Sequence, residues 1–361
     1  MRLYLLEIKY DQDQLINKND NVKLVKMKRQ KYFLILILLI FVSSFFLITK
    51  SQIRTKGVDQ VDISMIDELD LSRIYNITQD LSSYWTRLTG TLECDLAANY
   101  IRSRLNGTLN VTDTTVENWN YNKTVSSNVV ARVNGTNLKD ELVIIAAHYD
   151  SISSGGTAPG ANDNAVAVAV CMEVIRVIQN ISPLNRTLLF LSFAGEEQAF
   201  IGSKAWVTQH SDEFSKIIAV INLDMIGYGE YLTVIKNEQS NWLADIIVTS
   251  SSIVNVTFSK TNSPYPETSR FDHDTFWSVN VPCISIFEGG GATYPYYHTE
   301  DDTIDKISFS LVEKCAQATL LSVLYLGTMK FEHNWTNITI QIFSIWGIAT
   351  VLPILIYKKL K

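Results

Sequence analysis

The sequence predicts an α/β fold, in which a sheet is covered by helices on both faces. Four short, continuous apolar runs at 142–147, 187–193, 217–223 and 281–287 are typical of strands buried on both sides. Segments with helical spacing of apolar residues lie between these runs. Strands that alternate with helices along the chain indicate a sheet with helices packed on each face.

The individual elements follow in order along the chain. A polar linker over 50–80 leads into a helix at 92–105, where apolar residues recur at helical spacing. A strand at 128–133 then precedes the buried run at 142–147. Helices are expected at 165–178, from about 200 onward, at 242–253 and at 308–331, where the last helix closes the domain.

Two further apolar segments lie near the chain ends. Residues 32–49 carry no charge and are long enough to cross a bilayer as a helix. Five Lys or Arg residues lie within 23–31 and three within 50–56, which favours a cytosolic tail at 1–31 and an anchor at 32–49. A cleaved signal peptide is the alternative, but the leading region is too long for one and no clear cleavage site follows.

The second apolar segment, at 338–357, predicts another transmembrane helix with a cytosolic tail at 358–361. Gln341, Gly347 and Pro353 interrupt it, so a buried amphipathic helix is the alternative. Lys358 and Lys359 resemble a dilysine retrieval signal of endoplasmic-reticulum membrane proteins, and a simple stop-transfer cluster explains them equally well. Membrane embedding, with the endoplasmic reticulum favoured, is therefore the expected location.

Composition limits the partners. A formal net charge of −6 argues against a nucleic-acid partner, which requires a basic face. Ten Asn-x-Ser/Thr triplets all follow the segment at 32–49, which suits a glycoprotein domain in a lumen or outside the cell, although some arise by chance. The four cysteines are too few for a disulfide scaffold and leave three pairings open.

Polar clusters directly follow the four buried strands. They read AHYDS, AGEE, LDMIG and a loop rich in Tyr, His and Asp. Because ligands bind at the carboxyl ends of strands in such sheets, these clusters predict one site. Its potential ligands are His148, Asp150, Asp163, Glu196, Glu197, Asp224 and His298. So many carboxylates repel one another without a cation, and zinc accepts this mixture of nitrogen and oxygen ligands.

Each of these residues also has an ordinary structural interpretation on its own. A single histidine at a strand end is usually a hydrogen-bonded structural residue. Glu196 and Glu197 are also compatible with a helix N-terminus, where the helix dipole favours negative charge. The joint occurrence at successive strand ends is what favours a metal site.

The segments AHYDS, GANDN, AGEE, LDMIG and YYHTEDDT resemble the metallopeptidase family of aminopeptidase Y and bacterial aminopeptidase S, metallopeptidase family 28. The likeness extends from about residue 85 to about residue 331. It implies a catalytic domain at 81–335 with a mixed, mostly parallel sheet of about eight strands, and two zinc ions bridged by one aspartate.

The resemblance also implies roles for the metal ligands. His148 and Asp224 would hold one zinc, and Glu197 and His298 the other. Asp163, in the GANDN segment, would bridge the two ions.

Further roles follow for residues around the ions. Glu196 would be the general base that takes a proton from the attacking water and returns it to the leaving amine. Asp150 would orient the His148 ring. Tyr297 matches a position that stabilises the oxyanion, with Tyr294 and Tyr296 as nearby alternatives.

The activity implied by this likeness is removal of N-terminal residues from peptides with a free amino terminus. A single-zinc glutaminyl cyclase is the enzymatic alternative, and an inactive receptor-like relative is the non-enzymatic one. Asp272 and His273 lie in a segment that resembles the family's Ser-Asp-His motif. They either line the pocket or buttress the second metal, or they serve the structure. The oligomeric state is not indicated by the sequence.

Overall fold

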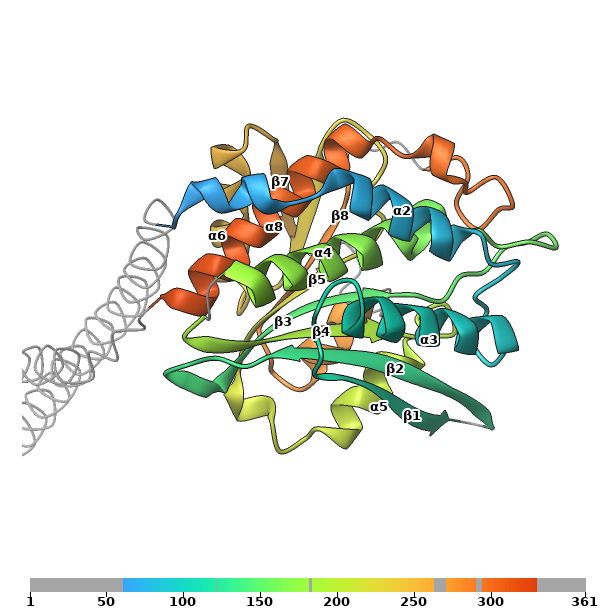
Figure 1. The fold of residues 1–361 in the computed structure, drawn as a ribbon, viewed down its shortest axis with the longest axis horizontal. Coiled ribbons are helices and arrows are strands. Elements are labelled where there is room, and N and C mark those ends of the chain that lie inside the picture. The colour runs from blue at the N-terminus through green and yellow to red at the C-terminus, as the bar shows by residue number, and fades with distance from the viewer. Residues whose placement is uncertain (1–60, 122, 182–183, 263–270, 290–293, 330–361) are drawn as a thin grey trace, which may run out of the picture.

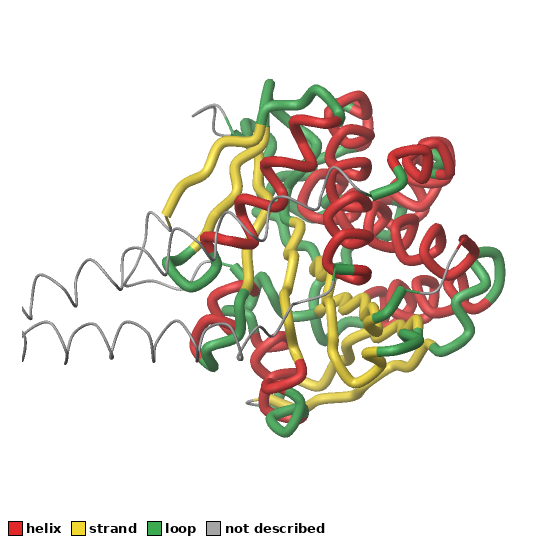
Figure 2. The backbone as a smooth tube through the Cα atoms, turned by 90° about the vertical axis from the view of Figure 1, so that its left-hand side faces the viewer, coloured by secondary structure: helices red, strands yellow, loops and turns green. Residues whose placement is uncertain are grey.

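The computed structural model describes residues 61–121, 123–181, 184–262, 271–289 and 294–329. These residues build an eight-stranded sheet in the order β1-β2-β4-β3-β5-β8-β6-β7, with helices packed against both faces (Figures 1 and 2). The expected α/β class with a mixed sheet of about eight strands is confirmed. The predicted terminal segments at 1–31, 32–49, 338–357 and 358–361 lie outside the described residues.

The strands pair in both directions. Their bounds are β1 Thr114–Tyr121, β2 Thr124–Val133, β3 Leu138–His148, β4 Arg186–Phe193, β5 Ile217–Leu223, β6 Leu232–Lys236, β7 Phe258–Asn262 and β8 Cys283–Glu288. The central strands β4, β3, β5 and β8 run parallel, as do β6 and β7. The pairs β1–β2, β2–β4 and β6–β8 are antiparallel.

Helices and short helical turns connect the strands. They are η2 Ile63–Glu68, α2 Leu71–Ser82, α3 Leu92–Asn106, η3 Ala161–Ala165, α4 Val166–Ile181, α5 Ile201–Gln209, η4 Phe214–Lys216, α6 Asn241–Ile253, α7 Asp272–Ser278, η5 Ile304–Lys306 and α8 Phe309–Thr328. Every helix expected between 92 and 331 is present, with ends shifted by a few residues. The structure adds α2 and α7 to them.

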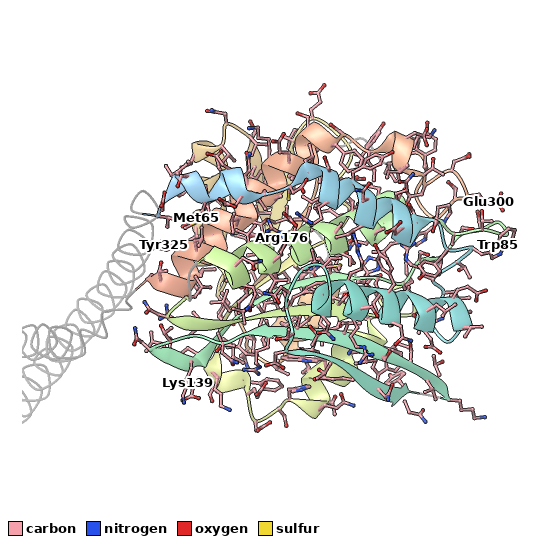
Figure 3. The ribbon with its side chains drawn as sticks, viewed as in Figure 1. Met65, Trp85, Lys139, Arg176, Glu300 and Tyr325 are labelled. Atoms are coloured by element: carbon pink, nitrogen blue, oxygen red, sulfur yellow. The ribbon has the colours of Figure 1, made fainter. Side chains whose placement is uncertain are left out.

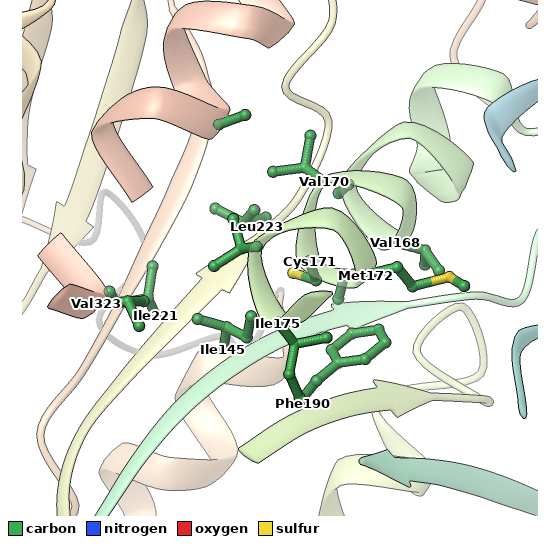
Figure 4. Close-up of a cluster of buried hydrophobic side chains, with 14 of the residues drawn as sticks. Ile145, Val168, Val170, Cys171, Met172, Ile175, Phe190, Ile221, Leu223 and Val323 are labelled. Atoms are coloured by element: carbon green, nitrogen blue, oxygen red, sulfur yellow. The ribbon is translucent and has the colours of Figure 1, made fainter. Parts of the chain in front are cut away.

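Alternate side chains of the central strands point to opposite faces of the sheet and pack into two separate hydrophobic cores. Ile145 of β3 packs with Cys171 of α4 and Val323 of α8 on one face (Figure 4). Its neighbours Ile144 and Ala146 join Trp206 of α5 and Phe276 of α7 on the other face. Because both faces of its second half are buried, β3 is apolar at every position from 142 to 147, and this continuous run predicted the strand.

The prediction of a linker at 50–80 is wrong from residue 63 onward, where the chain is helical. Within residues 63–82 the chain forms η2, which packs against α8, and α2, which packs against α4. Ile74, Ile77 and Leu81 recur at helical spacing and are buried in the main core. The stripe does not stand out in the sequence because polar residues dominate the rest of the segment. The folded domain therefore begins about twenty residues earlier than expected.

The buried carboxylate of Glu173 on α4 holds this N-terminal segment in place. It accepts a hydrogen bond from the Asp70 backbone N–H at 2.8 Å and from Arg176 Nε at 2.9 Å, and Arg73 Nε lies 3.3 Å away. The start of α2 is therefore tied to the domain by ionic and backbone contacts as well as by apolar packing.

Among the described helices, α8 alone is long and apolar enough to span a bilayer, and 72% of its apolar window is buried inside the domain. That burial is what a core helix shows. Figure 3 places Met65 and Tyr325, near the two ends of the described chain, at one end of the domain, and Trp85 and Glu300 at the opposite end.

Candidate metal centre

Polar residues from five separate segments meet at the carboxyl ends of the central strands. His148 is the last residue of β3, and Asp224 directly follows β5. Glu196 and Glu197 lie in the loop after β4, Asp163 lies in η3 before α4, and His298 lies in the loop before η5. The structure thus brings together the ligands that the sequence placed at successive strand ends.

The ligand atoms fall into two halves that share Asp163. His148 Nε2 lies 3.3 Å from Asp163 Oδ1 and 3.6 Å from Asp224 Oδ1. On the other side, His298 Nε2 lies 3.3 Å from Asp163 Oδ2 and 2.8 Å from Glu197 Oε2. Each half therefore has one imidazole and one carboxylate of its own and a different oxygen of the same aspartate.

Unpartnered atoms show that these side chains are not satisfied by one another. Glu197 Oε1 and His298 Nε2 are buried and form no hydrogen bond within the described chain. His298 Nε2 is in close contact with two carboxylate oxygens, yet its ring N–H is aimed at neither with hydrogen-bond geometry. Ligand atoms that lie within 4.8 Å of one another and are left without hydrogen bonds fit a cation.

The charges of the cluster lead to the same conclusion. Burial raises the pKa of Glu197 to about 8, with the Asp163 charge adding to the effect. Burial also raises the pKa of Asp224 and raises that of Glu196 well above its usual range. Although burial opposes it, the charges of Glu196 and Asp224 hold the pKa of His148 well above its usual value. Neighbouring acids that resist ionisation together are stabilised by a bound metal ion, and the nitrogen and oxygen donors suit zinc.

Asp150 connects the two sides of the site. Its Oδ1 lies 3.5 Å from His148 Nδ1 and accepts from the Glu196 N–H at 3.3 Å. Its Oδ2 accepts from Thr89 Oγ1 at 3.0 Å and from the Glu197 N–H at 3.4 Å. One carboxylate thus orients an imidazole and fixes the loop that carries both glutamates, which is the work of a positioning residue.

Asp302 is a site residue that the sequence reasoning did not single out. Its Oδ1 accepts from the Asn162 N–H at 2.9 Å and from Tyr294 Oη at 2.6 Å, and its Oδ2 accepts from the Asp163 N–H at 3.0 Å. It therefore holds the backbone that presents Asp163. Its only sequence signal was its place in the YYHTEDDT segment, four residues after His298.

The two asparagines beside Asp163 fix its loop to the sheet. The Asn164 side chain donates to the Leu223 carbonyl at 2.9 Å and accepts from the Met225 N–H at 3.1 Å, so it holds both neighbours of Asp224. Asn162 donates to Glu288 Oε2 at 2.9 Å. The Asn162 side chain therefore has a structural role and is not one of the expected metal ligands.

The loop also requires a glycine. Gly160 has φ +52°, and a Cβ there would lie 2.4 Å from the Asp163 carbonyl oxygen. Only glycine fits this backbone conformation and this close approach.

Glu196 and Tyr297 lie beside the ligands. The carboxylate of Glu196 comes within 4.8 Å of ligand atoms of both His148 and Glu197. Tyr297 is 48% exposed, and its ring stacks on His298 with centroids 3.7 Å apart. Tyr294, by contrast, is buried and bonded to Asp302, and Tyr296 packs edge-on against Tyr294. Of the three tyrosines, Tyr297 is the one that lies against a metal ligand with its ring open to solvent.

Asp272 and His273 begin α7 and are both buried. His273 packs against Phe271 and edge-on against Trp277, its ring nitrogens form no hydrogen bond among the described residues, and burial lowers its pKa to about 3. It joins no ligand cluster in the described chain and serves packing. Burial raises the pKa of Asp272 to about 7, and its charge contributes to the raised pKa of Glu196, so this carboxyl borders the site.

Comparison with known proteins identifies the family. Residues 128–323, more than half of the chain, match Peptidase family M28. The chain belongs to peptidase family M28. This match includes the segments that carry His148, Asp163, Glu196, Glu197, Asp224 and His298.

Curated relatives of this M28 chain include a "Probable leucine aminopeptidase" of Arthroderma benhamiae, 29% identical over 46% of this chain and 49% of the relative. Another is "Endoplasmic reticulum metallopeptidase 1" of Rattus norvegicus, 29% identical over 62% of this chain and 25% of the relative. The chain therefore spans about half of the first relative and a quarter of the second.

Solved structures share the fold. LapA of Legionella pneumophila, named an aminopeptidase, superposes with a TM-score of 0.64 at 22% identity, covering 74% of each chain. A glutaminyl cyclase from an Acidobacteriales bacterium superposes with a TM-score of 0.62 at 20% identity, covering 72% of this chain and 95% of that one. Both kinds of enzyme thus have this architecture, and the site has to discriminate between them.

Proposed function

We propose that this M28 chain is a zinc aminopeptidase that uses two metal ions to remove N-terminal residues from peptides with a free amino terminus. The observation that carries the proposal is the division of the ligands around Asp163. Each oxygen of this carboxylate faces a separate pair of one histidine and one carboxylate. A single-zinc cyclase would need only one such half.

His148 and Asp224 would hold one ion, Glu197 and His298 the other, and Asp163 would contribute one oxygen to each. Ions bound here would acidify a water molecule and polarise the scissile carbonyl. Every other part of the reaction belongs to side chains of the protein.

Glu196 is placed to act as the general base. It lies at the junction of the two halves and is 8% exposed, so a proton it accepts is shielded from bulk water. The proton taken from the attacking water would return to the amine of the leaving peptide as the carbon–nitrogen bond breaks. Tyr297, on the solvent side of His298, would donate a hydrogen bond to the oxyanion.

We further propose that the protein is anchored in a membrane of the secretory pathway, with its catalytic domain luminal or extracellular. The support is the pair of apolar segments at 32–49 and 338–357, the Asn-x-Ser/Thr triplets whose asparagines all lie between them, and the likeness to an endoplasmic reticulum metallopeptidase. Protease protection of the domain in sealed microsomes, and its loss on adding detergent, would test this orientation.

The test of activity compares the purified protein with Glu196→Gln on unblocked and N-acetylated aminoacyl amides and on a glutaminyl peptide. We expect cleavage of unblocked substrates only, loss of about 10²–10⁴-fold in kcat for the variant, and two zinc ions per chain in both proteins. Cyclisation of the glutaminyl peptide with one zinc per chain would establish the cyclase instead. Bound metal with neither reaction would reject both activities.

A further inference from the structure

A cavity of about 220 Å³ lies on the face of the sheet that α5 covers. It is lined by β1, β2, β4 and the C-terminal end of α5, and we call it the α5 cavity (Figure 1). Its lining includes Leu189 of β4, which lies four residues before Phe193, the strand partner of His148. Four residues span about 13 Å of strand, so the α5 cavity lies away from the metal centre.

Part of the cavity lining is apolar. Val130 of β2, Leu189 of β4 and Trp206 of α5 are buried and belong to the hydrophobic core on this face of the sheet. Such a surface stabilises the apolar part of a ligand through burial. The volume is below the roughly 300–1,000 Å³ of sites that hold drug-sized ligands, so the cavity fits only a small molecule.

Charged residues of both signs also line the cavity. Asp113, Glu117 and Glu213 contribute carboxylates, and Arg132 and His210 contribute the basic groups. Among these five, only Glu117 and His210 lie within ion-pair distance, with Oε1 and Nε2 3.6 Å apart. The Arg132 guanidinium forms no ion pair within the described chain. The cavity therefore contains opposite charges that the fold leaves largely unpaired.

Two buried polar atoms of the lining residues have no hydrogen-bond partner among the described residues. These are the donor Nε1 of Trp206, a residue only 1% exposed, and the acceptor Oε2 of Glu117. His210 stacks on the Trp206 ring with centroids 4.5 Å apart, and its Nδ1 donates to the Trp206 carbonyl at 2.9 Å, so the indole is held in place. Since nearly all buried polar groups are hydrogen-bonded, an unpaired donor and an unpaired acceptor here fit a ligand that offers both kinds of partner.

We propose that the α5 cavity binds a free α-amino acid with an apolar side chain, such as leucine. The Arg132 guanidinium would bind the carboxylate of the ligand, for which Trp206 Nε1 is a second donor. Glu117 Oε2 would accept a hydrogen bond from the ammonium group. The side chain of the ligand would pack on Val130 and Leu189. The inference does not rest on the proposed function, although that activity would release amino acids of this class.

Other small occupants fit the lining less well. A metal ion requires several ligand atoms close together, and the described residues around this cavity form no group of three potential ligands within 4.8 Å of one another. A simple anion would leave the Glu117 carboxylate without a partner. A simple amine would leave the Arg132 guanidinium without one. A zwitterion satisfies both charges.

The experiment is titration calorimetry of the purified full chain with leucine and with two analogues that each lack one charge. Isocaproate lacks the amino group of leucine, and isoamylamine lacks its carboxylate. We expect leucine to bind with a Kd of about 1 mM, the range for a ligand of so few atoms, and each analogue to bind at least about tenfold more weakly. No leucine binding up to about 10 mM would overturn the inference and leave water as the occupant. An analogue that binds as tightly as leucine would also overturn it.

Variants show whether leucine binds in this cavity, because the metal centre is a second potential site for an amino acid. Arg132→Gln and Glu117→Gln each remove one charged partner and should weaken binding at least about tenfold. Thr115→Phe keeps both charges, fills the cavity from an exposed lining residue and should abolish binding. Arg102→Gln and Glu238→Gln change exposed residues outside the cavity lining and should bind leucine as wild type does. Unchanged binding in the three cavity variants would overturn the inference.

Thermal melts provide a second readout that requires no hydrolysis. A ligand that binds only the folded protein raises its melting temperature, so leucine should raise that of wild type. Thr115→Phe should melt at the wild-type temperature without leucine, because the residue is exposed, and should show no shift with leucine. Equal leucine shifts in wild type and Thr115→Phe would overturn the inference.

Discussion

Replacing Asp150 with asparagine tests whether this carboxylate acts by positioning the metal ligands. The change keeps the shape of the side chain and retains one acceptor oxygen. The amide NH₂ that replaces Oδ2 cannot accept from the Glu197 N–H, now at 3.4 Å, or from Thr89 Oγ1, now at 3.0 Å. The variant therefore loosens the loop that carries Glu196 and Glu197 and removes a charge from beside His148.

The magnitude follows from the contacts that remain. Loss of the carboxylate that orients a metal-binding histidine usually lowers metal affinity about 10–100-fold. Here the Asp150 carbonyl oxygen stays 3.3 Å from His148 Nδ1 and keeps the ring oriented. We therefore expect a loss of zinc affinity nearer about tenfold, or about 1.4 kcal/mol.

Competition with a fluorescent zinc chelator would measure this affinity, with kcat recorded at saturating zinc. Asp305→Asn is the matched control, because Asp305 lies in an exposed pair with Lys306 away from the ligands. Wild-type zinc affinity in Asp150→Asn would refute a positioning role. A fully loaded but inactive variant would show that Asp150 takes part in the chemistry itself.

Three further predictions concern the supporting structure. Glu173→Gln should lower the free energy of unfolding by about 3 kcal/mol, read from denaturant titration, because the buried carboxylate that holds Arg73 and Arg176 loses its charge. A change under about 0.5 kcal/mol would contradict this. Gly160→Ala should abolish zinc binding by displacing the Asp163 loop, whereas Gly156→Ala, where the nearest atom lies 3.4 Å from the added Cβ, should bind zinc normally. The Glu117 carboxylate, 3.6 Å from His210 Nε2, raises the pKa of His210, so this pair stabilises the fold below about pH 6.5 and the effect is lost as pH rises through the raised pKa. The melting temperature of His210→Gln should therefore be lower than that of wild type at acidic pH and equal to it at alkaline pH.

The sequence identified the elements whose burial is uniform. Strands β3, β4, β5 and β8 are covered on both faces, and their apolar runs stand out without any knowledge of the fold. Strands β1 and β7 lie at the edges of the sheet and mix polar with apolar residues, so nothing in their sequence separated them from loops. Helix α2 resembles a linker in sequence because its buried stripe is narrow.

The residues of the site likewise include some that the sequence predicts and some that it does not. His148 and Asp224 were predictable because each ends or follows a buried strand, and chain direction alone brings such residues together. Asp302 acts only through contacts with Asn162, Asp163 and Tyr294, which are formed by folding. Arg87 likewise has a buried guanidinium that donates to the carbonyls of Tyr149 and Gly160. No local sequence pattern predicts that this arginine is buried.

Because Asp163 belongs to both halves of the centre, its loss has a different consequence from the loss of an outer ligand. Replacing Glu197 or Asp224 removes a ligand from one half and leaves the other half with its histidine, its carboxylate and one Asp163 oxygen. Replacing Asp163 deprives both halves at once. A change at one outer ligand would therefore affect one ion site and leave the other, whereas a change at Asp163 would affect both.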